Sequence, residues 1–293
     1  MAWLFRLSRP RFWLYIVGPL LVVWGSVYPA FFDWSVMQIS LFVCRMCWIF
    51  LGANVWIYGV NDYADRDTDR LNEKKQGYES LLDDVDKKKL LTVLGVVLLS
   101  RGLLMLATQI RRGGGRGRWV SRGLFYFFSS WYSLPPIRAK ARPFLDSLFN
   151  ILYLLPACAF WYLFYDSHPS FLLLGAGWLW CMAMHCFSAI PDILPDAQAG
   201  LRTTAVVLGK ERSGLRCSVL YACAHGAVFM YFWMQGETLG LFRTVFFGIS
   251  MIVYCGISLY ASRLTVDTFW WYRLFPWINA VVGFVIFWLF VSG

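Results

Sequence analysis

Long apolar runs separated by short polar connections constrain this chain more than any other feature of its sequence. The runs cover residues 12–31, 34–60, 90–110, 119–132, 144–165, 171–190, 215–235, 239–261 and 269–292. A helix of about twenty apolar residues crosses the hydrocarbon core of a bilayer, and the runs lack the period-two alternation of a membrane β-barrel. The sequence therefore predicts an all-α, polytopic membrane protein with about nine transmembrane helices. We expect residues 1–293 to form a single transmembrane domain.

The hydrophobic content and the net charge of the chain exclude some classes of protein. The chain is 59% hydrophobic and 15% charged, which excludes an ordinary soluble domain. Its net charge of +10 needs no nucleic acid as a partner, because basic loops are attracted to anionic lipid heads. The first apolar run is long enough to span and lacks an obvious small-residue cleavage site, so no cleavable signal peptide is expected. The lipid bilayer is the expected environment.

Basic residues give the expected sidedness. Arg6, Arg9 and Arg11 precede the first run, and Lys and Arg fill connections 66–89, 138–142 and 202–212, whereas 32–33, 166–168 and 236–238 carry none. Since Lys and Arg collect in cytoplasmic loops, the face with these basic connections is predicted to be cytoplasmic. With the predicted order of spans, the Arg-rich and Gly-rich loop 111–118 falls on the opposite, non-cytoplasmic side, against this rule.

The first motif that can carry chemistry is N-D-x-x-D-x-x-x-D, at the end of the second run. It contains Asn61, Asp62, Asp65 and Asp69. If the helix continues through the motif, Asn61, Asp65 and Asp69 share one face at a spacing of four residues. Carboxylates this close repel one another unless a cation lies between them, and carboxylate and amide oxygens suit Mg²⁺.

A second acidic motif, D-x-x-x-D-x-x-x-G, follows the sixth run with Asp192, Asp196 and Gly200. Pro191 and Pro195 interrupt this segment, which predicts a bent or broken helix end. Two acidic clusters on the same membrane face can hold two magnesium ions, which is what a diphosphate requires.

A third motif, Y-S-L-P-P-I-R-A-K, lies between the two acidic ones at residues 132–140. Pro135 and Pro136 are expected to end the preceding helix. The turn would present Arg138 and Lys140, whose cationic groups bind phosphate oxygens, although a plain cytoplasmic basic loop gives the same charges.

The order of these three motifs, with Arg202, Thr203 and Thr204 after the last, resembles the UbiA superfamily of intramembrane prenyltransferases over nearly the whole chain. The resemblance implies a helical bundle around a central cavity that opens sideways to lipid. It also implies Mg²⁺-dependent transfer from an allylic prenyl diphosphate to a lipophilic acceptor. A prokaryotic inner membrane, with the active site facing the cytoplasm, is implied as well.

The resemblance also assigns roles. The ligands of two Mg²⁺ ions would be Asn61, Asp65, Asp69, Asp192 and Asp196, the four aspartates being catalytic as well. Asp62 would support these ligands, and the diphosphate would meet Arg66, Arg138 and Lys140. The candidates for an apolar, aromatic wall that keeps water from a carbocation are Trp56, Tyr58, Tyr126, Tyr132, Tyr153, His185 and Phe187.

The residues after the first acidic motif indicate the acceptor. Family members that prenylate quinone precursors have an R-T-x-x-R-P-like run there, whereas this chain has Leu71-Asn72-Glu73-Lys74-Lys75. With the second acidic motif, this looks more like the carotenoid branch, the lycopene elongases, for which dimethylallyl diphosphate would be the donor. The alternatives are an aromatic quinone precursor as acceptor, a lipid-ether or haem-farnesylating member, and, from another class, an ion transporter with intramembrane carboxylates.

Overall fold

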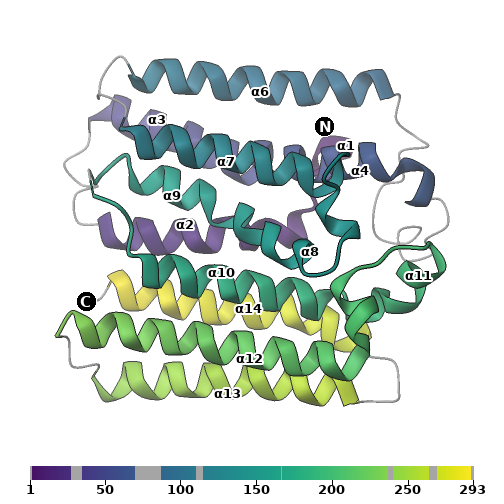
Figure 1. Ribbon diagram of the computed structural model, residues 1–293. Coiled ribbons are helices and arrows are strands. Elements are labelled where there is room, and N and C mark those ends of the chain that lie inside the picture. Colours follow the sequence, from purple (N-terminus) through teal and green to yellow (C-terminus); the bar gives the residue numbers. More distant parts are fainter. Residues whose placement is uncertain are drawn as a thin grey trace. The chain divides into compact units, whose positions relative to one another are not determined.

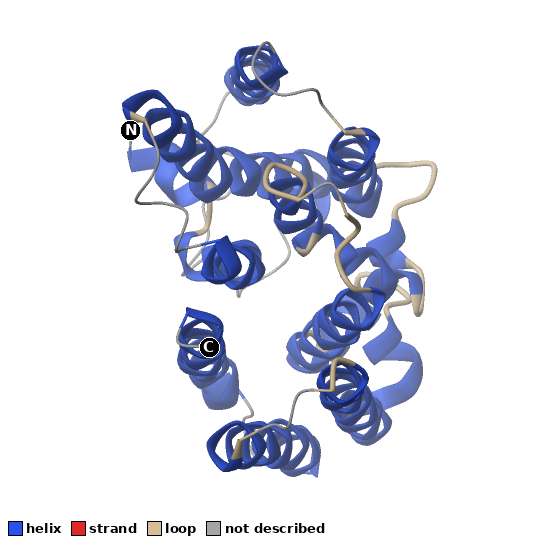
Figure 2. Ribbon diagram, turned by 90° about the vertical axis from the view of Figure 1, so that its left-hand side faces the viewer, coloured by secondary structure: helices blue, strands red, loops and turns tan. Residues whose placement is uncertain are grey.

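The computed structural model describes residues 2–27, 35–69, 87–109, 115–165, 167–236, 240–263 and 269–291. A few side chains within these ranges, including those of residues 65–69, lie outside the description. Each regular element in the described ranges is a helix, and no strand occurs among them (Figure 2). The predicted all-α class is therefore confirmed. The chain forms two compact units, Met1–Arg138 with Leu155–Asp166 and Ala139–Leu154 with Ser167–Gly293.

Unit 1 carries the first acidic motif. Its helices are α1 (Ala2–Leu7), α2 (Trp13–Val27), α3 (Val36–Cys47), α4 (Asn54–Asp69), α6 (Lys87–Gln109), α7 (Arg116–Ser133) and α9 (Leu155–Trp161) (Figure 1). A π-helical stretch, Trp48–Ala53, joins α3 to α4. Helix α7 packs against both α4 and α9, while α2 packs on α9 and α6 on α4. Aromatic rings also meet between α2 and α3, where the ring centroids of Trp24 and Phe42 lie 4.8 Å apart.

Unit 2 carries the second acidic motif. Its α-helices are α8 (Leu145–Leu148), α10 (Phe171–Ser188), α11 (Ile193–Gln198), α12 (Thr204–Met234), α13 (Leu241–Arg263) and α14 (Phe269–Val291). Helix α12 packs along both α10 and α13, and α14 contacts α13. In the centre of the unit, Tyr221 and Tyr254 stack with ring centroids 4.7 Å apart. The Tyr254 hydroxyl donates to Oδ1 of Asn279 at 2.7 Å, which joins α13 to α14.

The expected helix over residues 144–165 is wrong as a single regular span. This segment divides into α8, a 3₁₀ stretch over Phe149–Tyr153, and α9. Phe144 has a left-handed backbone (φ 67°), and the Asn150 amide donates to the Asp146 carbonyl. Such side-chain hydrogen bonds to the backbone compete with helical ones. The helix expected from residue 215 starts earlier, because α12 begins at Thr204, where Thr203 caps it by accepting from the Val206 amide. A kink at Gly209 (φ 74°) separates this first stretch from the long part of α12.

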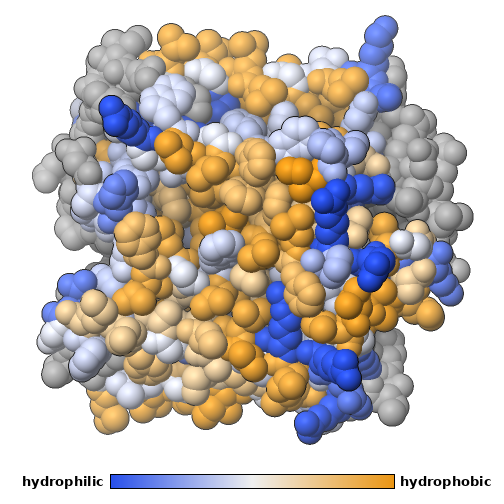
Figure 3. Space-filling view, viewed as in Figure 1, coloured by the Kyte–Doolittle hydropathy of each residue, from blue (hydrophilic) through white to orange (hydrophobic). Residues whose placement is uncertain are grey.

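The outer surfaces of the helices are apolar. Hydrophobic side chains cover much of the face in Figure 3, and exposed examples are Leu99, Trp233, Ile252 and Phe284. Among the described residues, four helical stretches are long and apolar enough to cross a membrane: Val36–Ala64, Phe171–Gln198, Thr204–Met234 and Leu241–Arg263. Apolar surface of this extent is typical of helices in contact with lipid. The count of about nine spans stays a prediction.

Candidate active site

The first acidic motif continues α4 without a break. Helix α4 runs from Asn54 through Asp69, which meets the condition for a shared face. Positions 61, 65 and 69 therefore lie on one face of this helix. The side chains of Asp65, Arg66 and Asp69 lie outside the described residues.

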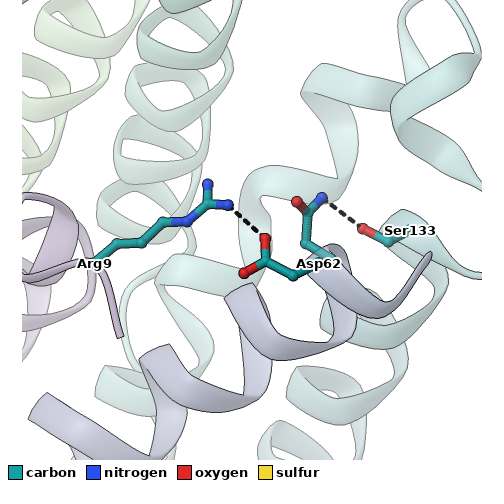
Figure 4. Close-up of polar contacts among 4 residues, drawn as sticks. Arg9, Asp62 and Ser133 are labelled. Atoms are coloured by element: carbon teal, nitrogen blue, oxygen red, sulfur yellow. Dashed lines mark hydrogen bonds and ion pairs between the residues drawn. The ribbon is translucent and has the colours of Figure 1, made fainter. Parts of the chain in front are cut away.

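Asn61 joins this helix to the third motif. Its Nδ2 donates to Oγ of Ser133, at 3.0 Å, and Ser133 is the buried last residue of α7 (Figure 4). Because the amide nitrogen is used in this bond, the amide oxygen keeps its lone pairs for a cation. The contact fixes the end of α7, where the Y-S-x-P-P motif begins, beside the first acidic motif.

Asp62 is held by a cation that the sequence did not indicate. The Arg9 Nη2 donates to Oδ1 of Asp62 at 2.6 Å, and Asp62 is only 4% exposed (Figure 4). The same guanidinium lies 4.8 Å from the ring centre of Tyr58, one helical turn before Asp62. In the sequence Arg9 belongs to a basic N-terminal segment, and two residues 53 positions apart carry no local pattern that indicates their contact.

The third motif ends α7 as predicted. The helix stops at Ser133, and the chain turns through Pro135 and Pro136. Arg138 then takes a left-handed backbone (φ 41°), with its amide donating to the Leu134 carbonyl at 2.8 Å. Lys140 lies in a short 3₁₀ turn, and both cationic side chains are half-buried.

The second acidic motif has the broken helix that its prolines predicted. Helix α10 ends at Ser188, a 3₁₀ turn covers Ile190–Asp192, and α11 follows. Asp192 directly precedes α11, and Asp196 lies one turn further along, so these half-buried carboxylates share one side. Gly200 (φ 72°) then reverses the chain, which explains the glycine of the motif.

Two adjacent threonines fix the segment after this reversal. The Thr203 hydroxyl donates to Oδ2 of Asp196 at 3.4 Å. Oδ2 of Asp146 accepts from the Thr204 amide at 2.6 Å, and its Oδ1 accepts from the Thr204 hydroxyl. The Phe144 amide donates to that hydroxyl at 2.6 Å, and the Ser147 amide donates to Asp146 at 2.6 Å.

Asp146 and Thr204 thus join two motifs within unit 2. Both residues are at most 1% exposed, and a buried carboxylate needs such partners to stay in place. The segment that follows Lys140 and the segment that follows Asp196 are held against each other by this clamp. The sequence carries a single signal for Asp146, an acidic residue inside the apolar run 144–165.

Several of the aromatic residues expected to line a cavity pack against other rings. Trp56 and Tyr126 meet edge to face, with centroids 5.2 Å apart, and Phe187 lies against Phe275 at 4.7 Å. Among the described side chains, no three His, Cys, Asp or Glu residues come together as a metal site. The predicted ligand set, which includes Asp65 and Asp69, stays a prediction.

The helices and motifs define an integral membrane protein with carboxylate-rich helix ends, flanked by basic residues. Residues 13–275 match the UbiA prenyltransferase family, and the chain belongs to this family of membrane-embedded enzymes that transfer prenyl groups. The lycopene elongase/hydratase of Halobacterium salinarum is 36% identical over 97% of this chain and 94% of its own. The lycopene elongase/hydratase of Haloferax volcanii is 37% identical over 100% of this chain and 91% of its own length.

A solved structure agrees with the fold. The UbiA homolog from Archaeoglobus fulgidus bound to DMAPP and Mg²⁺ superimposes with a TM-score of 0.71 and 20% identity, covering 99% of each chain. This likeness shows that the chain has the fold of that UbiA homolog.

Proposed function

We propose that this enzyme transfers dimethylallyl groups from dimethylallyl diphosphate to a terminal double bond of a carotenoid such as lycopene. The observation that carries the proposal is the 36% identity with a lycopene elongase/hydratase over 97% of the chain. The chain covers nearly all of that relative, so the likeness is not confined to one motif.

The metal in this proposal is Mg²⁺, with two ions bound by Asn61, Asp65, Asp69, Asp192 and Asp196. The donor chemistry fits, because each ligand is a carboxylate or amide oxygen, the type that Mg²⁺ prefers. Asn61, whose nitrogen is held by Ser133, has its oxygen left for a metal. When bound, Mg²⁺ supplies positive charge that stabilises a leaving diphosphate.

The cations of the chain act on the same diphosphate. Arg66, Arg138 and Lys140 bind its oxygens, and Asp62 keeps the first motif in place through Arg9. The allylic carbon–oxygen bond breaks, and its electron pair leaves with the diphosphate. The acceptor double bond then forms the new carbon–carbon bond, and the resulting cation loses a proton or takes up water.

The proposed location is a prokaryotic inner membrane with the site facing the cytoplasm. The support is the distribution of Lys and Arg, which collect in the connections beside all three motifs. A water-soluble diphosphate would reach the motifs from that side, and a carotenoid would enter from the bilayer.

The test uses purified protein in liposomes that contain lycopene, with radiolabelled dimethylallyl diphosphate. We expect label in the carotenoid fraction, loss of transfer with EDTA and recovery with Mg²⁺. The Asp65→Ala variant should be inactive. Asp67→Ala is the matched control, because position 67 lies about 200° around the helix from position 65. Label in added 4-hydroxybenzoate, with none in lycopene, would overturn the carotenoid acceptor.

A further inference from the structure

Three arginines are buried in unit 1, away from the acidic motif. Arg101 on α6 is 7% exposed, and Arg118 and Arg122 on α7 are 2% and 5% exposed. A buried charge is costly unless an opposite charge and hydrogen bonds compensate it. Within the described ranges, no carboxylate lies at ion-pair distance from Arg101 or Arg122. The positive charge of these two side chains therefore lacks a compensating carboxylate in that part of the chain.

Unused hydrogen-bond donors meet at one small cavity. Its walls include Trp48, Arg101, Arg122, Phe125 and Tyr126. Nε and Nη1 of Arg122 and the hydroxyl of Tyr126 are buried and make no hydrogen bond. The Arg101 guanidinium lies 4.4 Å from the ring centre of Trp48, which holds it at the cavity wall. Buried donors of this kind normally have an acceptor.

The cavity size and its charge restrict what can fill it. Its volume is about 10 Å³, which is enough for one water-sized atom. A water molecule would accept hydrogen bonds but carries no negative charge. It would leave the charge of Arg122 uncompensated, and Arg101, Arg118 and Arg45 add further positive charge around that side chain. An oxygen of an anion supplies both the acceptor and the negative charge.

The cavity is separate from the acidic motifs. Arg122 lies eleven residues before Ser133 in α7, which is about 16 Å along the helix from the contact with Asn61. It is six residues from the start of α7 at Arg116, or about 9 Å from that end. The same end of α7 contains the last residues of the Arg-rich segment 111–118, whose basic charge runs against the positive-inside count.

We propose that Arg101, Arg122 and the Tyr126 hydroxyl form a binding site for a phosphate group, one oxygen of which enters the cavity. The guanidinium fork suits phosphate oxygens, and the nearby helix end brings the site close to the headgroup layer of a bilayer about 30 Å thick. The phosphate belongs either to an anionic lipid headgroup or to free phosphate in solution. The site lies apart from the three motifs, and it shares Tyr126 with the aromatic residues expected to wall the prenyl-transfer cavity.

The test measures binding to purified full-length protein by native mass spectrometry. One arm adds phosphatidylglycerol against phosphatidylcholine, and the other adds inorganic phosphate. We expect Arg122→Gln to bind phosphatidylglycerol, or inorganic phosphate, at least about tenfold more weakly than wild type does, because the variant lacks the guanidinium charge. The matched control is Arg116→Gln on the same helix, since Arg116 is exposed, and it should bind as wild type.

The two arms identify the source of the phosphate. Selective loss of phosphatidylglycerol in Arg122→Gln identifies a lipid headgroup, and loss of inorganic phosphate alone identifies a soluble ligand. If Arg122→Gln does not fold, Tyr126→Phe removes only the hydroxyl and should still weaken binding several-fold. Unchanged binding of both probes in the folded variants would overturn the proposal.

Discussion

At the scale of single residues, the site depends on two buried carboxylates, one paired with a cation and the other with neutral hydrogen-bond donors. Asp62 is matched by a full charge, that of Arg9. Asp146 is matched by neutral donors, chiefly the amide and hydroxyl of Thr204. Neither partner is near in sequence, which is why both were missing from the sequence prediction, although Asp62 itself and Thr204 were part of recognised motifs.

The ion pair between Arg9 and Asp62 should contribute to stability. We expect Arg9→Gln to lower the free energy of unfolding by about 3 kcal/mol, because it leaves a buried carboxylate without its cation. Adding Asp62→Asn should recover part of the loss, since the double variant buries no charge. Thermal unfolding in detergent of wild type, both single variants and the double variant measures this coupling. Strictly additive losses would show that the two groups do not interact.

The clamp at Asp146 should matter for turnover as well as for folding. Asp146→Asn places an amide group where two donors of Thr204 need acceptors, and an unsatisfied buried group costs about 1–3 kcal/mol. We expect lower stability and a raised KM for the diphosphate, because the segments after Lys140 and Asp196 lose their link.

Thr204 provides the control for that prediction. Thr204→Ser keeps the hydroxyl and should retain near wild-type kinetics, whereas Thr204→Val removes it and should behave like Asp146→Asn. Steady-state kinetics over a range of diphosphate concentrations separates the variants. A wild-type KM in folded Thr204→Val would exclude the clamp from substrate binding.

At the scale of elements, the sequence predicted the helices well where hydrophobicity alone decides them. Helix α10 and the broken segment after it follow from an apolar run and from Pro191 and Pro195. Residues 144–165 were mispredicted, because an apolar run cannot reveal that Asp146 and Asn150 bind the local backbone. The start of α12 was missed because residues 204–214 are too polar to read as a span, although Thr203 caps them.

Helix packing in unit 2 depends on a glycine. A Cβ at Gly214 would overlap the Ser262 side chain and lie 2.6 Å from the Ser258 carbonyl, so α12 and α13 are in close backbone contact there. Gly214→Val should destabilise the protein by about 1–3 kcal/mol or more through overpacking. Gly226→Ala on the same helix is the control, because nothing lies within 4 Å of its Cβ position. Gly226→Ala should leave the melting temperature in detergent unchanged or raise it. Equal melting temperatures for Gly214→Val and Gly226→Ala would contradict the close packing at Gly214.

At the scale of the whole molecule, the proposed function combines motifs from both units. The first acidic motif belongs to unit 1, and the second, with Lys140, belongs to unit 2. Sequence order and residue chemistry were enough to identify the family, while the metal ligands they suggest stay a prediction. They could not give the supporting contacts, because Arg9, Ser133 and Asp146 act through three-dimensional neighbours that no local pattern encodes.

The most direct test of the central claim is pigment analysis in a bacterial host that accumulates lycopene. Expression of the wild-type chain should yield carotenoids whose masses are higher by one and two five-carbon units. Asp192→Ala should yield lycopene alone, while Asp67→Ala should match wild type. Unchanged lycopene beside a well-expressed, membrane-inserted wild-type protein, or elongated pigment from Asp192→Ala, would contradict the account.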